Sequence, residues 1–338
     1  MPTIAVDAMG GERAPDEIVK GAAQISLTTD IDCLLVGDED RVQAVLEQQE
    51  YNPERISLVD CRNAVGMDED PAAAAGRRDT SLTVALQAVK AGGADALVSA
   101  GNTAACVLAS TRVWRLVPGV RRAALAAVYP RHREYPEQDP LALVLDVGAS
   151  LRCDALDLVE FAVMGSAYAR RISKVESPRV GLLNVDRDPR AGDDMLIEAH
   201  RLLAAEPGLN FVGNVEGHDL VRGGADVIVC EGLVGNVARK LFEGVSGVML
   251  DVARAAGEHR LMWRLGLRLL SEGIERLQAL TDYSNYGGAP ILGFDRVFIK
   301  CHGRSNAHAV ANAIKVAAKA VRDDVTGEIT AVMAKRRR

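Results

Sequence analysis

Short apolar runs alternate with longer segments of helical periodicity along most of this chain. The short runs are apolar almost throughout, whereas strands with one solvated face alternate between apolar and polar residues. Such runs are typical of parallel strands that helices cover on both faces. The sequence therefore predicts an α/β fold with a mostly parallel sheet, helices on both of its faces and right-handed crossovers.

The apolar runs and the helical stretches between them define the expected elements. The expected strands are Thr3–Asp7, Asp32–Val36, Ile56–Val59, Ala94–Ser99, Leu125–Tyr129, Leu141–Asp146, Arg179–Asn184, Asn210–Gly213, Asp226–Cys230 and Val297–Lys300. The expected helices are Asp16–Thr28, Asp40–Gln48, Thr80–Lys90, Thr103–Arg115, Asp154–Ile172, Met195–Ala205, Val237–Ala256 and Ser305–Asp323. No internal repeat or low-complexity linker separates them, so we expect one α/β unit over residues 1–338, or two intimately joined subdomains that divide near residue 140.

The composition argues against several classes of protein. A net charge of -6 disfavours a general nucleic-acid binder, because affinity for a phosphate backbone needs a broad basic surface. The first residues lack the features of a secretory signal, and no stretch reaches the ~20 apolar residues that span a bilayer. The six cysteines are scattered without a CxxC pair, which favours reduced thiols and no metal site. We therefore expect a cytoplasmic protein that binds no nucleic acid.

Glycine and small polar residues gather where several expected strands end. Asp7 is followed by Gly10 and Gly11, and Ser99 by Gly101. The other strand-end residues of this kind are Asn102, Thr103, Asp146, Gly148, Asn184, Asn214, Glu216, Glu231, Gly232, Gly235 and Asn236. Ligands of open parallel sheets bind at such ends, where glycine permits close approach and helix N-termini offer N–H donors to anions. One such turn alone is ordinary turn chemistry, but their repetition predicts a wide anion-binding cleft along one sheet edge. The sequence has no P-loop or well-placed GxGxxG, so it predicts no nucleotide site.

Basic side chains near these turns are candidates to hold an anion or to move a proton. Lys240 lies one turn into the helix after Asn236, as either an anion ligand or a solvated lysine. Arg77 and Arg78 precede an expected helix start, where they either clamp an anion or solvate a loop. His302 follows the last strand, a position that favours a functional role, although a lone histidine is more often structural. Triad chemistry is not supported, because no serine occupies a nucleophile elbow and no Cys–His pairing is evident.

The same segments resemble the motifs of one known family, the PlsX-type phosphate acyltransferases. The matching segments, in the family's order, are AVDAMGG with Ala14-Pro15, SAGNT, DVGA, FAVMGSAYA, SPRVGLLNV, GNVEGHDL, GNVARKLFEG, YSNYGGAPILG and HGRSN. The match runs nearly from end to end, and several of the motifs are long.

This resemblance implies a fold, a reaction and partners. The fold would be similar to isocitrate and isopropylmalate dehydrogenases and to phosphotransacetylase, in a homodimer. The reaction would move a fatty acyl group from the thioester of acyl carrier protein to inorganic phosphate, and the acyl phosphate would feed phospholipid synthesis. No metal or organic cofactor is expected. Phosphate is itself a nucleophile, so such a protein mainly positions it and stabilises the developing oxyanion.

The strand-end positions and the resemblance together predict a site. Its catalytic residues would be Lys240, His302, Asn236 and Asn102. Its phosphate- and substrate-binding residues would be Asp7, Gly10, Gly11, Arg78, Ser99, Gly101, Thr103, Asp146, Gly148, Asn184, Asn214, Glu216, Gly235, Gly287 and Gly288. Lys240 and Arg78 would supply positive charge, and His302 is a weaker candidate for proton transfer.

Several residues depart from the family's motifs. Ser150 stands where the family typically has Asn, Asp186 where it has Gly, and Ala191 where it has Lys, with Arg190 one position earlier. Asp186 in place of a glycine would make a positive φ less accessible to the backbone and would add a charge. Three readings follow: an enzyme with tolerated drift, a paralogue with another acyl donor or acceptor, or a catalytically weak copy. A non-catalytic protein that binds carrier protein or membrane, and another enzyme of the same broad fold, are the alternatives from other classes.

A basic amphipathic helix is expected near residues 257–283, protruding from the body. Arg260, Arg264 and Arg268 recur every four residues and share one face, beside an apolar stripe of leucines. Such a helix either packs in a core or dimer, or contacts anionic lipid or the acidic carrier protein. Peripheral contact with an anionic membrane through residues 259–283 is therefore an expectation.

Overall fold

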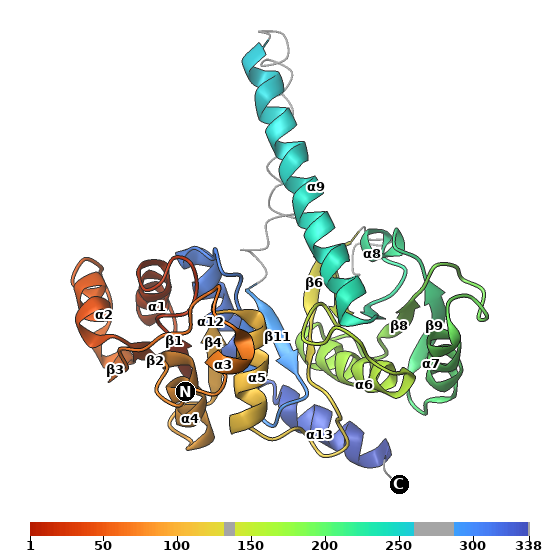
Figure 1. The fold of residues 1–338 in the computed structure, drawn as a ribbon, viewed down its shortest axis with the longest axis horizontal. Helices are drawn as coiled ribbons and strands as arrows, with labels where there is room; N and C mark the ends of the chain where they lie inside the picture. Colours follow the sequence, from red (N-terminus) through yellow and green to blue (C-terminus); the bar gives the residue numbers. More distant parts are fainter. Residues whose placement is uncertain (132–138, 260–286, 337–338) are drawn as a thin grey trace.

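The structure is a computed structural model that describes residues 1–131, 139–259 and 287–336. These residues form two β-sheets with helices packed against their faces, and a long helix rises between the sheets (Figure 1). Most neighbouring strands within each sheet run parallel. The predicted α/β class with mostly parallel strands is confirmed.

The first sheet contains seven strands in the order β3-β2-β1-β4-β12-β11-β5. Their bounds are β1 Thr3–Asp7, β2 Asp32–Gly37, β3 Ile56–Asp60, β4 Ala96–Ser99, β5 Ala124–Leu125, β11 Ala289–Leu292 and β12 Val297–Lys300. All of these strands are parallel to their neighbours except β11, which is antiparallel to both β12 and β5. The sequence did not predict β11, because Pro290 and the glycines before it are typical of a turn.

Helices cover both faces of the first sheet. Ile4 and Val6 of β1 point to the face covered by α1 and α12, whereas Ala5 between them points to the face covered by α4 and α5. Gly21 permits the close crossing of α1 and α12, since a Cβ there would lie 2.7 Å from the carbonyl oxygen of Ala307. The helices of this half are α1 Asp16–Thr28, α2 Glu39–Leu46, η1 Pro53–Arg55, α3 Pro71–Ala74, α4 Ser81–Lys90, α5 Thr103–Val113 and α12 Ala307–Arg322.

The second sheet contains five strands in the order β6-β7-β10-β8-β9, and β6 alone is antiparallel to its neighbour. Its strands are β6 Ala127–Pro130, β7 Leu141–Leu145, β8 Arg179–Leu183, β9 Asn210–Val215 and β10 Val227–Val229. Its helices are α6 Ala155–Ile172, α7 Asp194–Ala205, α8 Asp219–Arg222 and α13 Val325–Arg336. Leu143 and Leu145 face the core that contains α6 and α13, whereas Val144 faces a core shared with the first sheet.

The chain passes from the first sheet to the second between Leu125 and Ala127. The prediction of a single strand over Leu125–Tyr129 was wrong, because this segment contains two strands. The first, β5, pairs with β11, and the second, β6, pairs with β7. Between them the Ala126 N–H donates to the carbonyl oxygen of Pro290 at 2.9 Å. The change of sheet depends on pairing with distant residues, so no local pattern marks it. Whether the chain forms one unit, or two subdomains that divide near residue 140, stays a prediction.

The long helix α9, Gly232–His259, projects away from both sheets (Figure 1). It begins five residues before the predicted Val237, directly after β10. Within the described ranges, no helix is long and apolar enough to cross a membrane. Most of the predicted amphipathic segment, residues 260–283, lies outside the described residues.

Candidate functional site

Asp7 organises the turns at the carboxyl edge of the first sheet. Its carboxylate is buried and accepts hydrogen bonds from the hydroxyls of Ser81 at 2.6 Å and Ser99 at 2.7 Å. The Ser99 hydroxyl in turn accepts the N–H of Gly101 at 3.0 Å. Burial raises the pKa of Asp7, while these hydrogen bonds lower it. A Cβ at Gly10 would clash with the carboxylate, so glycine there lets the turn close over Asp7.

Asp146 organises the corresponding turn of the second sheet. Its fully buried carboxylate accepts five hydrogen bonds, from the N–H groups of Leu125, Gly148, Ala149 and Ser150 and from the Ser150 hydroxyl, at 2.7 to 3.1 Å. Because these donors use its acceptor positions, the carboxylate holds the turn and joins it to β5. Ser150, although it departs from the family motif, is therefore part of this network.

The amino end of α9 packs directly on the Asp146 turn. A Cβ at Gly235 would clash with the Asp146 carbonyl oxygen, and a Cβ at Gly232 would clash with the Ser150 carbonyl oxygen. Gly148 has φ +130°, and a Cβ there would lie 3.6 Å from the side chain of Asn236. The structure thus brings together the predicted residues Asp146, Gly148, Gly235 and Asn236.

A cavity of about 290 Å³ lies between the two sheets and α9. Its lining includes Met67, Gly101, Thr103, Leu125, Ala127, Val128, Tyr129, Val147, Arg239, Phe242, Glu243, Gly288, Ala289, Lys300, His302 and Gly303. One wall, built from β5, β6 and Phe242, is mostly apolar. The other segments that line the cavity contribute polar turns, His302 and Lys300. Of the predicted site residues, Gly101, Thr103, Gly288 and His302 line this cavity.

Asn102 and Asn236 lie next to the cavity and hold its walls. Asn102 caps α5 by accepting the Ala105 N–H at 3.1 Å, and its amide donates to the Met67 carbonyl at 2.9 Å. Asn236 accepts a hydrogen bond from Arg239 at 3.2 Å. In this arrangement both amides position cavity residues, and contact of either with substrate stays a prediction.

The cationic side chains at the cavity differ from those that the sequence singled out. Lys240 and Arg78 are exposed, and the lining formed by the described residues contains neither. Arg239 and Lys300 line the cavity instead. The sequence did not indicate Lys300 because it ends an apolar strand. The rotation of α9 about its axis places Arg239, and not the adjacent Lys240, at the cavity. This rotation depends on tertiary packing.

Lys300 places a buried amine at the cavity. The residue is 5% exposed, and its ammonium donates to the carbonyl oxygen of Cys301. Burial lowers the pKa of Lys300, whereas the negative charge of Asp7 opposes this shift. A buried cation with few polar partners attracts an anionic ligand, because such a ligand restores the interactions lost from water.

His302 lies beside Lys300 on the cavity wall. Its Nδ1 accepts the Arg304 N–H at 3.2 Å, so in this tautomer the proton resides on Nε2. Burial lowers the pKa of His302 below its usual 6.5, which favours the neutral ring at pH 7. A neutral ring with a proton on Nε2 can donate that hydrogen to an oxygen or sulfur atom in the cavity.

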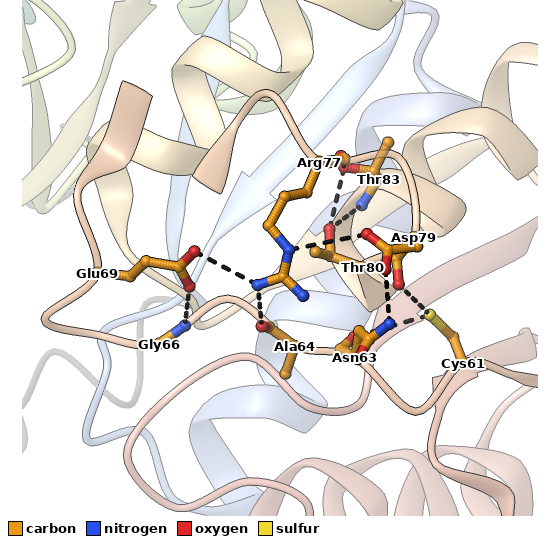
Figure 2. Close-up of polar contacts among 9 residues, drawn as sticks. All are labelled: Cys61, Asn63, Ala64, Gly66, Glu69, Arg77, Asp79, Thr80 and Thr83. Carbon is orange, nitrogen blue, oxygen red and sulfur yellow. Dashed lines mark hydrogen bonds and ion pairs between the residues drawn. The ribbon is translucent and has the colours of Figure 1, made fainter. Parts of the chain in front are cut away.

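Arg77 contacts both ends of the loop from Ala64 to Glu69 (Figure 2). Met67 of this loop lines the cavity. Its guanidinium lies 3.3 Å from the Glu69 carboxylate and 3.7 Å from that of Asp79, and it donates to the Ala64 carbonyl at 3.4 Å. These contacts occupy guanidinium N–H groups of Arg77 that would otherwise be available to bind an anion. Arg77 therefore holds a loop through ion pairs and a hydrogen bond, a role that differs from both predicted alternatives.

Three predicted residues lie at the outer strands of the second sheet. The amide of Asn184 donates to the Ala191 carbonyl at 3.0 Å, and that of Asn214 to the Asp188 carbonyl at 2.8 Å. Glu216 lies 3.6 Å from the guanidinium of Arg187. The expectation that all these turns share one sheet edge was wrong, because two sheets divide them and β8 and β9 lie farthest from the first sheet.

The loop after β8 accommodates the departures from the family motif. Asp186 does not have a positive φ, so the backbone at this position does not require glycine. Its carboxylate accepts the Asp188 N–H at 2.9 Å, a local turn that suits Asp. Gly192 supplies the positive φ of this loop, +90°, just after Ala191. These substitutions fit a closed loop held by Asn184 and Asn214.

The arrangement of two mostly parallel sheets covered by helices is shared with α/β proteins of known structure. A phosphotransacetylase from Streptococcus pyogenes matches with a TM-score of 0.64 at 16% identity, over 95% of this chain and 94% of that one. A 4-hydroxythreonine-4-phosphate dehydrogenase from Klebsiella pneumoniae matches with a TM-score of 0.52 at 14% identity, over 95% of this chain and all of that one. At such identities the likeness establishes the fold, and it confirms the predicted phosphotransacetylase-like and dehydrogenase-like class.

Residues 2–328 match the model of a family described as "Fatty acid synthesis protein", and the chain belongs to this family. Curated relatives named "Phosphate acyltransferase" include one from Dictyoglomus turgidum, 39% identical over 96% of both chains. Another, from Desulfitobacterium hafniense, is 41% identical over 97% of this chain and 96% of the relative. The predicted family is confirmed.

Proposed function

We propose that this protein transfers a fatty acyl group from the thioester of acyl carrier protein to inorganic phosphate, in the cytoplasm. The observation that carries the proposal is the cavity, which joins an apolar wall to polar turns, Lys300 and His302. An acyl chain and a phosphate ion need these two kinds of surface side by side. Relatives named phosphate acyltransferase cover nearly the whole chain, which supports the same activity.

The reaction needs positioning more than a protein nucleophile. An oxygen of the phosphate dianion attacks the thioester carbonyl carbon, the C–O bond forms, and the C–S bond breaks. The proton of the hydrogen phosphate passes to the leaving thiolate, so the products are acyl phosphate and the carrier thiol. Holding both reactants in an attack geometry supplies much of the rate enhancement of such a displacement.

We assign the phosphate to the polar wall of the cavity. Lys300 would hold the anion, and the turns at Gly101 and Gly303 would line the space around it. His302 would donate a hydrogen bond from Nε2 to the leaving sulfur and so stabilise the thiolate until it takes the proton of the hydrogen phosphate. Asp7 and Asp146 would contribute indirectly, by fixing the turns that form the edges of the site.

The activity is tested by measuring release of the carrier thiol from a long-chain acyl carrier protein over a range of phosphate concentrations. We expect release that saturates with phosphate and is negligible without it. Phosphate-independent release, or binding of the acyl carrier without any release, would contradict the proposal. The second outcome would favour the non-catalytic carrier-binding alternative.

We also propose a homodimer that α9 stabilises. Five of its exposed apolar residues recur at spacings of three and four, which places them on one helix face: Val237, Leu241, Val245, Val248 and Val252. Each is between 50% and 65% exposed. A helix face of this kind on a projecting element is suited to packing against its copy.

A charged residue in this stripe should dissociate the dimer. We expect Val245→Glu to change the mass in solution from dimer to monomer, because the carboxylate would have to be buried without a partner. Leu27→Glu is the matched control, since Leu27 is also exposed, at 53%, but lies on α1. Light scattering coupled to size exclusion measures both variants. Equal masses for the wild type and Val245→Glu would rule out this interface.

Peripheral membrane contact through residues 259–283 remains part of the proposal. Its support is the sequence alone, in which arginines repeat every four residues beside leucines. Flotation with anionic and with neutral vesicles tests it, and equal flotation would argue against an electrostatic contact.

A further inference from the structure

Two hydrogen-bond donors without acceptors belong to side chains that line the same cavity. The hydroxyl of Tyr129 and the Nε of Arg239 are buried, and neither has a hydrogen-bond partner among the described residues. Tyr129 is 3% exposed, so bulk water does not satisfy its hydroxyl. Buried polar groups are nearly always paired, and an exception at a cavity indicates a partner that arrives with a ligand.

The two donors belong to neighbouring parts of the wall. The ring of Tyr129, on β6, contacts the ring of Phe242, on α9, with centroids 5.7 Å apart. Phe242 follows Arg239 by three residues, so the two side chains share one face of the helix. The remaining nitrogens of Arg239 are held by Glu243 at 2.5 Å and by Asn236 at 3.2 Å, which fixes the guanidinium in place.

The chemistry of these groups specifies what they recognise. Burial raises the pKa of Tyr129, so the phenol keeps its proton and acts as a donor. An arginine Nε–H is also a donor, so the missing group is an acceptor. The wall around them is apolar, formed in part by Leu125, Ala127 and Val147. The ligand atom is therefore an oxygen attached to an apolar chain.

We propose that Tyr129 and Arg239 bind the carbonyl oxygen of the acyl thioester, an inference that rests on the proposed acyl transfer. The phosphate would occupy the opposite wall at Lys300 and His302, and the carbonyl carbon would lie between the two groups. As phosphate attacks, negative charge develops on the carbonyl oxygen, and donors already in place stabilise that charge. Tyr129 and Arg239 thereby orient the acyl donor and lower the barrier.

The test separates recognition of the carbonyl from turnover. Tyr129→Phe removes only the hydroxyl, and binding is measured for two uncleavable carriers: one with its long chain joined through an amide, which keeps the carbonyl, and one joined through a thioether, which lacks it. We expect the variant to bind the amide-linked carrier about 10-fold more weakly and the thioether-linked carrier as the wild type does. In turnover, kcat/KM for the acyl carrier should fall by about 10-fold or more, while KM for phosphate stays unchanged.

A matched control removes another buried phenol. Tyr168, on α6, is 4% exposed and does not line this cavity, so Tyr168→Phe should leave both binding constants unchanged. Stability gives a further readout: deleting a hydroxyl without a partner should not lower the midpoint of urea unfolding of Tyr129→Phe. A lowered midpoint with unchanged carrier binding would assign Tyr129 a structural role and overturn the proposal.

The outcomes also distinguish this inference from the proposed function. A wild type that binds the amide-linked carrier more tightly than the thioether-linked one, and loses this preference in Tyr129→Phe, yet makes no acyl phosphate, would support carbonyl recognition and contradict acyl transfer to phosphate. An active wild type whose Tyr129→Phe variant keeps full carbonyl discrimination, or changes only KM for phosphate, would overturn the inference alone.

Discussion

Replacing Lys300 by methionine should lower kcat/KM for phosphate by about 10- to 100-fold, the effect of losing charge-assisted hydrogen bonds in a largely dry site. Lys300 is 5% exposed, lines the cavity and carries a buried amine there. Methionine has a similar length and an apolar end, so Lys300→Met removes the charge with little loss of packing. Steady-state kinetics over a range of phosphate concentrations measures the effect, and circular dichroism checks that the variant is folded.

Replacing Lys240 by methionine as well shows which of the two lysines binds phosphate. Lys240 is the residue that the sequence favoured, and it is exposed on α9 outside the cavity lining of the described residues. We expect Lys240→Met to change kcat/KM for phosphate less than Lys300→Met does. The reverse ranking would assign the phosphate to Lys240 and would contradict the placement of the anion at Lys300.

Replacing Asp146 by alanine should lower the free energy of unfolding by about 3–5 kcal/mol. The substitution leaves five donors without their acceptor, four backbone N–H groups and the Ser150 hydroxyl. It also loosens the turn on which the amino end of α9 packs, because Gly235 lies against the backbone of Asp146. Urea unfolding followed by circular dichroism measures the change.

Asp193→Ala is the comparison for Asp146→Ala. The Asp193 carboxylate is exposed and caps α7 through one hydrogen bond, from the Leu196 N–H at 3.0 Å. Loss of such a cap typically costs about 1 kcal/mol. If both variants lost equal stability, the Asp146 network would contribute no more than an ordinary helix cap, and its organising role would be disproved.

Much of the fold could be predicted because burial leaves a local signature. Thr3–Asp7, Val297–Lys300 and Asp16–Thr28 were predicted with the bounds that the structure has, since fully buried strands and amphipathic helices repeat at their own periods. The break between β5 and β6 has no such signature. It depends on pairing of Leu125 with β11 and of Ala127 with β7, residues far away in the chain.

The candidate site was predicted in part, for a similar reason. The strand-end rule found Asp7, Asp146 and His302, because carboxyl ends of parallel strands attract polar turns. It did not show that both aspartates hold turns with their carboxylates, which depends on donors from Ser81 and Leu125. Spacing also does not reveal which way a helix is rotated.

Tyr129 illustrates a further limit of the sequence. A tyrosine in an expected strand is typical of a core residue, and its ring does pack in the core. Only the three-dimensional arrangement shows that its buried hydroxyl has no partner in the described part of the chain. Neither spacing nor composition predicts such an unsatisfied atom.

The most direct test of the proposed transfer is the identity of the product. The purified protein is mixed with a long-chain acyl carrier protein and oxygen-18-labelled phosphate, and the products are analysed by mass spectrometry. We predict an acyl phosphate that carries the oxygen label, formed together with free carrier thiol. Unlabelled fatty acid as the sole product, formed at the same rate without phosphate, would show attack by water and would contradict the proposed function.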